Sequence, residues 1–174
     1  MRKIAIWGVL ALLVTALAAV AAQAATVGPV AATSTERTGG LHFVGTPTVT
    51  ATKTSTSAFL TANGEVAGAG STGGTANLSS TALVTTGCIN RGSQGQQPSG
   101  LQRSTQFPSG TVTFPTTRQG RGSFTVSTQA VTTAGRTCPD QMQPVLVGVT
   151  FTDITLTVTS QTGTTTAFFP DIDP

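Results

Sequence analysis

The sequence predicts an all-β protein: an antiparallel β-sandwich of about seven to nine strands, immunoglobulin-like in the broad sense, with one disulfide and a signal peptide before it. Three observations lead to this prediction. Thr and Val are abundant while Glu, Lys and Leu are scarce, and β-branched residues favour strands. Short runs of alternating apolar and polar residues begin near residue 41, and Gly and Pro break them at spacings of roughly 8 to 12 residues. No segment after the signal has the period of an amphipathic helix.

The N-terminus has the layout of a secretory signal peptide. Arg2 and Lys3 supply a positive start, and an unbroken apolar run follows from Ile4 to Ala22. Ala22-Gln23-Ala24 is a small-x-small cleavage site. We therefore expect residues 1–24 to be removed and the protein to be secreted, with no membrane attachment after cleavage. The alternative is a protein anchored in the membrane by an uncleaved signal, because the apolar run approaches the ~20 residues that span a bilayer.

The rest of the chain has the length of one domain. We expect residues 25–40 to be a flexible leader, residues 41–170 to be the β-sandwich domain and residues 171–174 to be a tail. The whole chain has nine Lys and Arg against six Asp and Glu. Two of the nine leave with the signal, so the mature net charge would be about +1. Such a weak field does not predict nucleic-acid binding.

The strands in the first half follow from alternation. Residues 41–52 form the first strand region, which Pro47 interrupts. Residues 57–68 form the second, as one strand or as two, because Asn63-Gly64 is a strong type I′ hairpin signal. Residues 76–88 give the clearest strand, in which every second side chain from Ala76 to Cys88 would point to the buried face.

In the second half, residues 111–116 and 123–131 predict a hairpin around residues 118–122. The apolar side chains then occupy odd positions from 145 to 151 and even positions from 154 to 158. This change of parity near Thr152-Asp153 predicts a bulge or a break, because a slip of one residue turns the side chains to the other face. Residues 165–169 would form the last strand.

The two cysteines, Cys88 and Cys138, are most simply a disulfide in an exported chain. Closing a loop of about 50 residues would stabilise the fold by about 4 kcal/mol. The bond would bring together two predicted loops, residues 89–110 and 132–144. Their charged and polar residues form a candidate binding face: Asn90, Arg91, Arg103, Arg136 and Asp140.

Several segments resemble a known group of proteins. They are residues 55–68 (STSAFLTANGEVAG), residues 87–92 (GCINRG, with its Cys-x-Asn-x-Gly pattern), the later Cys138-Pro139, and residues 149–157 (VTFTDITLT). Together they resemble an uncharacterised group of small secreted actinobacterial all-β proteins. The group usually continues the first segment with a Gly-Leu-Gly-Asn turn, whereas this chain has Gly68-Ala69-Gly70-Ser71. The resemblance implies a secreted β domain and no catalytic or ligand residue.

Side chains for catalysis are scarce. His42 is the only histidine, the six acids are scattered, and Asp153 is better explained by bonding to its local backbone than as a base. With no Tyr, and with the one Trp in the signal, stacking on sugars is disfavoured. We predict no catalytic residue, no cofactor and no metal ion.

These observations predict a secreted, non-enzymatic β-sandwich that interacts with an envelope, matrix or protein partner through the two loops. The partner and the oligomeric state do not follow from the sequence. The alternative is a small secreted hydrolase with its site in the same loops. A third possibility is a subunit of a larger assembly that pairs through an edge strand.

Overall fold

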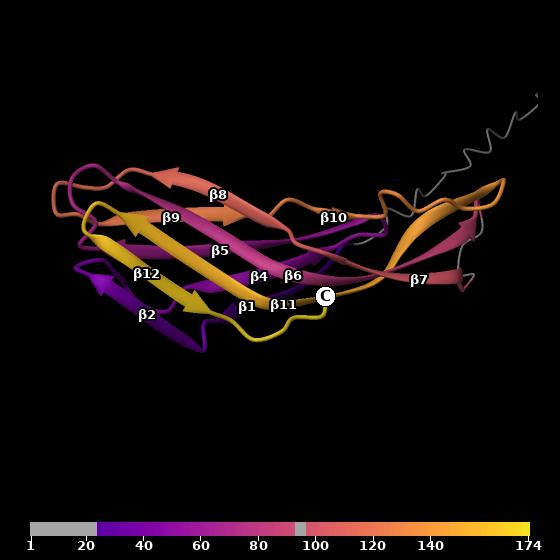
Figure 1. The fold of residues 1–174 in the computed structure, drawn as a ribbon, viewed down its shortest axis with the longest axis horizontal. Helices are drawn as coiled ribbons and strands as arrows, with labels where there is room; N and C mark the ends of the chain where they lie inside the picture. The colour runs from indigo at the N-terminus through magenta and orange to yellow at the C-terminus, as the bar shows by residue number, and fades with distance from the viewer. Residues whose placement is uncertain (1–23, 93–96) are drawn as a thin grey trace, which may run out of the picture.

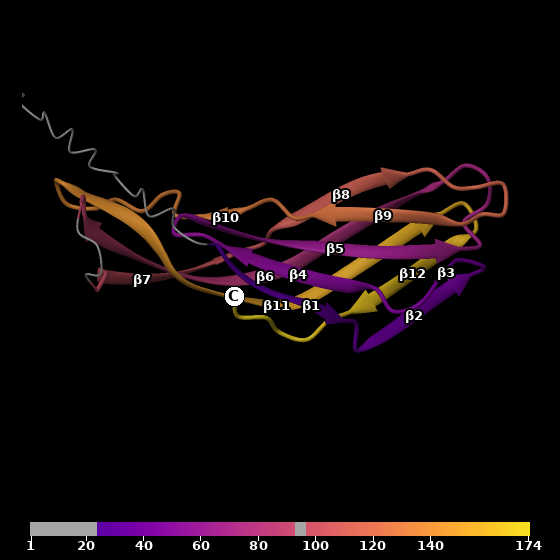
Figure 2. The same ribbon diagram turned by 180° about the vertical axis from the view of Figure 1, so that it is seen from behind.

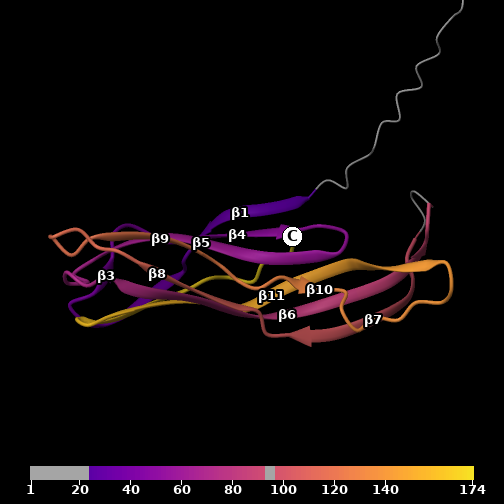
Figure 3. The ribbon, with the colours of Figure 1, turned by 90° about the horizontal axis from the view of Figure 1, so that it is seen from above.

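The computed structural model describes residues 24–92 and 97–174, and every regular element in these two ranges is a β-strand. The strands form two six-stranded sheets, which pack on each other as two layers (Figures 1 and 3). The predicted all-β sandwich is therefore confirmed, with twelve strands in the described residues instead of the expected seven to nine. The predicted signal peptide, apart from its last residue Ala24, lies outside the described residues.

The first sheet is built around β4 and β5. Its order is β1-β4-β5-β10, and β3 and β9 also pair with β5. All of these pairings are antiparallel. The strands are β1 (Ala25–Ala31), β3 (His42–Phe43), β4 (Thr48–Lys53), β5 (Ser57–Ala67), β9 (Gly122–Ser127) and β10 (Val131–Thr132).

The second sheet is built around two long strands, β6 and β11, which lie side by side (Figure 2). Its order is β2-β12-β11-β6-β7, and β8 also pairs with β6. These pairings are antiparallel too. The strands are β2 (Ser34–Gly39), β6 (Gly74–Asn90), β7 (Ser99–Gln106), β8 (Ser109–Phe114), β11 (Met142–Ser160) and β12 (Gly163–Phe168).

Inward side chains of both sheets form one apolar core. Leu60 of the first sheet and Leu78, Phe151 and Leu156 of the second are fully buried. Along β6 every second residue from Ala76 to Cys88 is buried, as the alternation predicts: Ala76, Leu78, Ser80, Ala82, Val84, Thr86 and Cys88. The burial of this apolar surface is the main favourable contribution to folding.

The predicted bulge in the long C-terminal strand is confirmed. The register between β11 and β6 shifts between Thr152 and Thr155, and Asp153 has a φ of 52° in the left-handed region. The extra residue turns the chain so that Phe151 and Ile154 both point into the core. The Asp153 carboxylate accepts a hydrogen bond from the Thr152 hydroxyl at 3.4 Å, rather than one from the backbone as expected.

The predicted flexible leader is wrong, because residues 25–40 are mostly strand. β1 pairs with β4, and β2 pairs with β12. The register of β1 shifts between Val27 and Val30, which removes the alternation a strand would show. All six residues of β2 are exposed, because this edge strand packs neither face. Neither strand therefore has the apolar periodicity from which a strand is predicted.

The Asn63-Gly64 hairpin does not form. Both residues lie inside β5, which pairs with β4 on one side and β9 on the other. Gly64 is opposite Phe124 on β9, and a Cβ atom added at Gly64 would lie 2.7 Å from the ring atom Cζ of Phe124. Gly64 therefore leaves space for the ring of Phe124 and does not form a turn.

The predicted hairpin around residues 118–122 is wrong in its pairing, although both strands exist. β8 pairs with β6 in the second sheet, and β9 pairs with β5 in the first. The connection therefore crosses between layers, and it is closed by hydrogen bonds between Thr117 and Arg121 and between Gly120 and Thr117. Alternation shows which face of a strand is buried, but not which strand it pairs with.

The predicted tail is also wrong, because residues 171–174 return to β11. Ile172 is only 3% exposed. It exchanges two backbone hydrogen bonds with Phe151, at 2.9 and 3.0 Å. This segment brings the C-terminus beside the middle of β11 (Figure 1).

Candidate functional site

Strands β6, β7 and β11 run past the end of the first sheet and form an extension at one end of the molecule (Figures 1 and 2). The predicted disulfide lies in this extension and is confirmed: Cys88 and Cys138 are bonded, with their Cα atoms 5.8 Å apart. The bond joins β6 to the segment between β10 and β11. A lasting disulfide is compatible with an extracellular location.

The predicted long loop, residues 89–110, is wrong for most of its length. β6 continues to Asn90, and Ser99–Gln106 is the edge strand β7. Seven of the eight β7 residues are exposed, so this strand shows no apolar alternation. Residues 93–96 lie outside the described residues. The second predicted loop, residues 132–144, is shorter than expected, because its first residue belongs to β10 and its last residues belong to β11.

The structure does not gather the five residues of the predicted binding face on one surface. Residues opposite each other in an antiparallel pair share a face. Arg103 is opposite Thr85, and Gln102 is opposite Thr86. Because Thr86 is buried toward the core side, Gln102 points inward and Arg103 points outward.

Arg136 lies on the inward side of β7. Its guanidinium donates hydrogen bonds to Oε1 of Gln102, at 3.1 Å, and to the main-chain oxygen of Gly100. Its Nε atom is buried without a hydrogen-bond partner in the described structure. Arg136 therefore holds the segment of residues 133–141 against the inward side of β7.

Asn90, Arg91 and Asp140 lie at the tip of the extension, where β6 ends and β11 begins. Asn90 is opposite Met142 in the ladder. The backbone N–H of Arg91 donates to the carbonyl of Gln141 at 3.1 Å. All three side chains are exposed. They are thus separated along the strands from Arg103.

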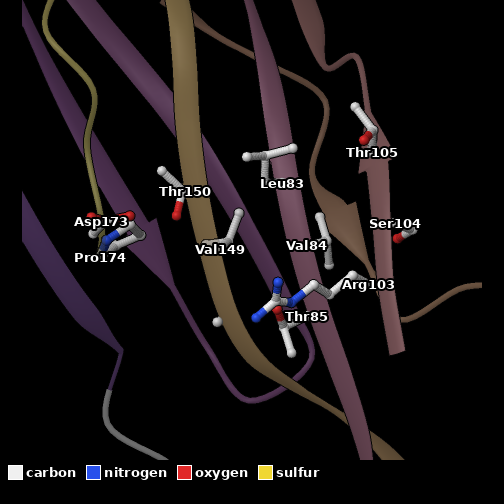
Figure 4. A pocket seen from close by; sticks show the side chains of 11 residues that line it. Leu83, Val84, Thr85, Arg103, Ser104, Thr105, Val149, Thr150, Asp173 and Pro174 are labelled. Carbon is white, nitrogen blue, oxygen red and sulfur yellow. The ribbon is translucent and has the colours of Figure 1, made fainter. Parts of the chain in front are cut away.

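A hollow of about 630 Å³ lies on the outward face of the second sheet. We call it the β6–β7 trough (Figure 4). The residues that matter below are Leu83 and Thr85 of β6, Arg103 of β7, Thr150 of β11, and Asp173 and Pro174 of the C-terminal segment. Of the five predicted residues, only Arg103 lines it.

One exposed large apolar side chain, Leu83, lines this trough, and others lie outside its lining. In the described chain the exposed large apolar residues are Leu83, Leu101, Phe107 and Val147. Leu83 is 50% exposed within the trough. Leu101 and Val147 converge over Gly87, where an added Cβ atom would lie 3.2 Å from each of them. Phe107, 77% exposed, follows β7 directly.

Sequence reasoning missed this apolar cluster. Its signal was present as apolar residues at outward positions, such as Leu83 between the outward Thr81 and Thr85. The exposed apolar residues come from β6, from β7 and the residue after it, and from β11, so no single stretch of sequence displays them together.

Arg103 and Asp173 are the charged residues of the trough, and Figure 4 shows Asp173 on one side of Thr150 and Arg103, with Leu83, on the other. Within residues 24–92 and 97–174, neither forms an ion pair or a side-chain hydrogen bond. The ion pair found in these ranges joins Arg121 and Glu65 at 2.9 Å, beside another hollow.

The residues considered for catalysis lie elsewhere. His42, on β3, has its ring Nδ1 3.1 Å from the carbonyl oxygen of Gly40. Neither His42 nor Asp153 lines the trough. Across the part of the chain that the structure describes, no group of three or more His, Cys, Asp or Glu residues could hold a metal ion.

The chain matches no protein family, no curated protein and no solved structure in the three comparisons made. The resemblance to the secreted actinobacterial group stays a prediction. Among the described residues, no helix is long and apolar enough to cross a membrane.

Proposed function

We propose that this protein is an exported, non-enzymatic interaction module that binds an envelope, matrix or protein partner through the β6–β7 trough. The observation that carries the proposal is the presence in one hollow of an exposed apolar side chain, Leu83, and of Arg103, which has no side-chain partner within the described residues. Contiguous exposed apolar surface typically marks interaction sites. Arginine beside apolar anchors is typical of binding hot spots.

The make-up of the trough favours binding over hydrolysis. Its lining contains one carboxylate, Asp173, and no histidine. Paired acid and base groups, which hydrolysis of glycosides or esters uses, are not provided there. Arg103 instead offers a fork of N–H donors for a carboxylate or phosphate group. The proposed interaction therefore involves the trough rather than the two predicted loops, residues 89–110 and 132–144.

The experiment uses residues 25–174, purified with the disulfide intact, and measures binding to an isolated cell-envelope fraction from the source organism. We compare Leu83→Ser and Arg103→Gln with the control Arg118→Gln, an exposed arginine outside the trough. We expect each trough variant to weaken binding at least tenfold and the control to bind as the wild type does. Equal binding by all four proteins would overturn the proposal.

A further inference from the structure

We infer that the partner seated on the β6–β7 trough is a second copy of this chain, packed face to face about a twofold axis. This inference rests on the proposed function, because it names the partner of the same surface. It is argued from the charges, the shape and the apolar residues of the trough.

The charges of the trough are arranged for self-association. A twofold interface brings the same patch of both copies together. A group on one side of the axis in one copy therefore meets the group that lies on the opposite side of the axis in the other copy. Arg103 and Asp173 lie on opposite sides of Thr150 (Figure 4). A twofold axis that passes midway between the two charges, beside Thr150, would bring Arg103 of each copy to Asp173 of the other.

Both charges are available for this exchange. Neither Arg103 nor Asp173 has an ionic or hydrogen-bonded side-chain partner within the described residues. A partner with a single charge would leave one of the two covered and unpaired, which costs free energy. A second copy pairs both of them, and it forms two ion pairs at once.

The C-terminal segment supplies a fixed ridge beside the trough. Ile172 is tied to Phe151 by two backbone hydrogen bonds. Lys53 Nζ donates to the main-chain oxygen of Pro174 at 3.0 Å. A ridge held at both points is preorganised for binding. The ridge of one copy would enter the trough of the other beside Arg103.

The apolar residues would provide most of the affinity. Leu83, which is 50% exposed in the trough, would be covered by the second copy. Leu101 and Val147, which converge over Gly87, extend the apolar surface along the same face. Covering these side chains removes apolar surface from water, which is the main driving force of association.

The test is the molar mass of residues 25–174, measured by light scattering and sedimentation from about 1 to 200 µM, a span typical of weak to moderate dimers. We expect the mass to rise toward that of a dimer. Arg103→Asp and Asp173→Arg should each weaken association at least tenfold, and the double variant should restore it. The control Arg118→Asp should behave as the wild type. Circular dichroism and thermal melting check that every variant is folded.

A wild type that stays monomeric over this range overturns the inference. The inference is also overturned if Arg103→Asp and Asp173→Arg both associate as the wild type does, or if the folded double variant fails to associate. The double variant also separates this inference from the proposed function. The double variant would still fail to bind a foreign partner that contacts Arg103, whereas it would regain binding to a second copy of itself. If the wild type is monomeric while trough variants lose envelope binding, the proposed function holds and the second copy is the wrong partner.

Discussion

The guanidinium of Arg136 lies 3.1 Å from Oε1 of Gln102, on the face of β7 opposite to Arg103. The same guanidinium caps the main-chain oxygen of Gly100. β7 is the last strand of its sheet, and such an edge exposes backbone groups that can pair with other chains. One arginine thus anchors the neighbouring segment to this edge strand.

From this contact we predict that Arg136→Gln destabilises the fold by about 1–2 kcal/mol, because hydrogen bonds from a charged donor are lost and the carbonyl of Gly100 loses its cap. Urea unfolding measures the change. Arg118→Gln, which removes an exposed arginine outside these contacts, is the matched control. Equal midpoints for the two variants would show that the Arg136 contacts do not stabilise the extension.

The second prediction concerns the disulfide. Cys88 and Cys138 are 50 residues apart, and the loop-entropy relation gives about 4 kcal/mol for a loop of that size. The double variant Cys88→Ala/Cys138→Ala should therefore lose about that much stability in urea. Adding a reductant should destabilise the wild type similarly and leave the double variant unchanged. A reductant effect on the double variant would point to a cause other than this bond.

Local patterns predicted those parts of the fold that a single stretch of sequence can report. The alternation from Ala76 to Cys88 identified the buried face of β6, because each inward side chain packs against the first sheet. The change of parity near Asp153 identified the bulge, because the strand stays buried on both sides of it. The isolated cysteine pair identified the disulfide.

The parts that were missed depend on contacts between distant segments. β2 and β7 are edge strands exposed almost throughout, so no apolar period marks them. Ile172 is one apolar residue among polar and proline neighbours, and only its pairing with Phe151 makes it core. The trough adds Arg103 to Leu83 and Asp173, which lie far apart in the chain and meet only across the sheet.

A third prediction tests the close approach of β5 and β9. Gly64→Ala would place a Cβ atom 2.7 Å from Cζ of Phe124, inside the buried layer. We expect a loss of about 1–3 kcal/mol, typical of overpacking. Gly40→Ala is the control, because a Cβ atom at Gly40 meets nothing within 4 Å.

The origin of that loss can be verified by a double-mutant cycle with Phe124→Leu, which shortens the side chain at the point of collision. Gly64→Ala should cost less in the Phe124→Leu background than in the wild type, since residues in contact are not additive. Additive losses would mean that the ring does not cause the strain.

The last prediction concerns the C-terminal segment. Ile172 is 3% exposed and belongs to the core, so Ile172→Ala should cost about 2–4 kcal/mol through the cavity it leaves. Asp171→Ala, at the exposed neighbouring position, should change stability by less than about 0.5 kcal/mol. Thermal or urea unfolding of both variants makes the comparison.

Amide hydrogen exchange tests the same segment without a substitution. The N–H of Ile172 donates to the backbone carbonyl of Phe151 at 3.0 Å, and Phe151 is a fully buried residue of β11. We therefore expect the Ile172 amide to exchange with the slow amides of β11, because it opens only when the strand does. Rapid exchange of Ile172, together with a neutral Ile172→Ala variant, would show that the segment is frayed in solution and that the ridge beside the trough is not fixed.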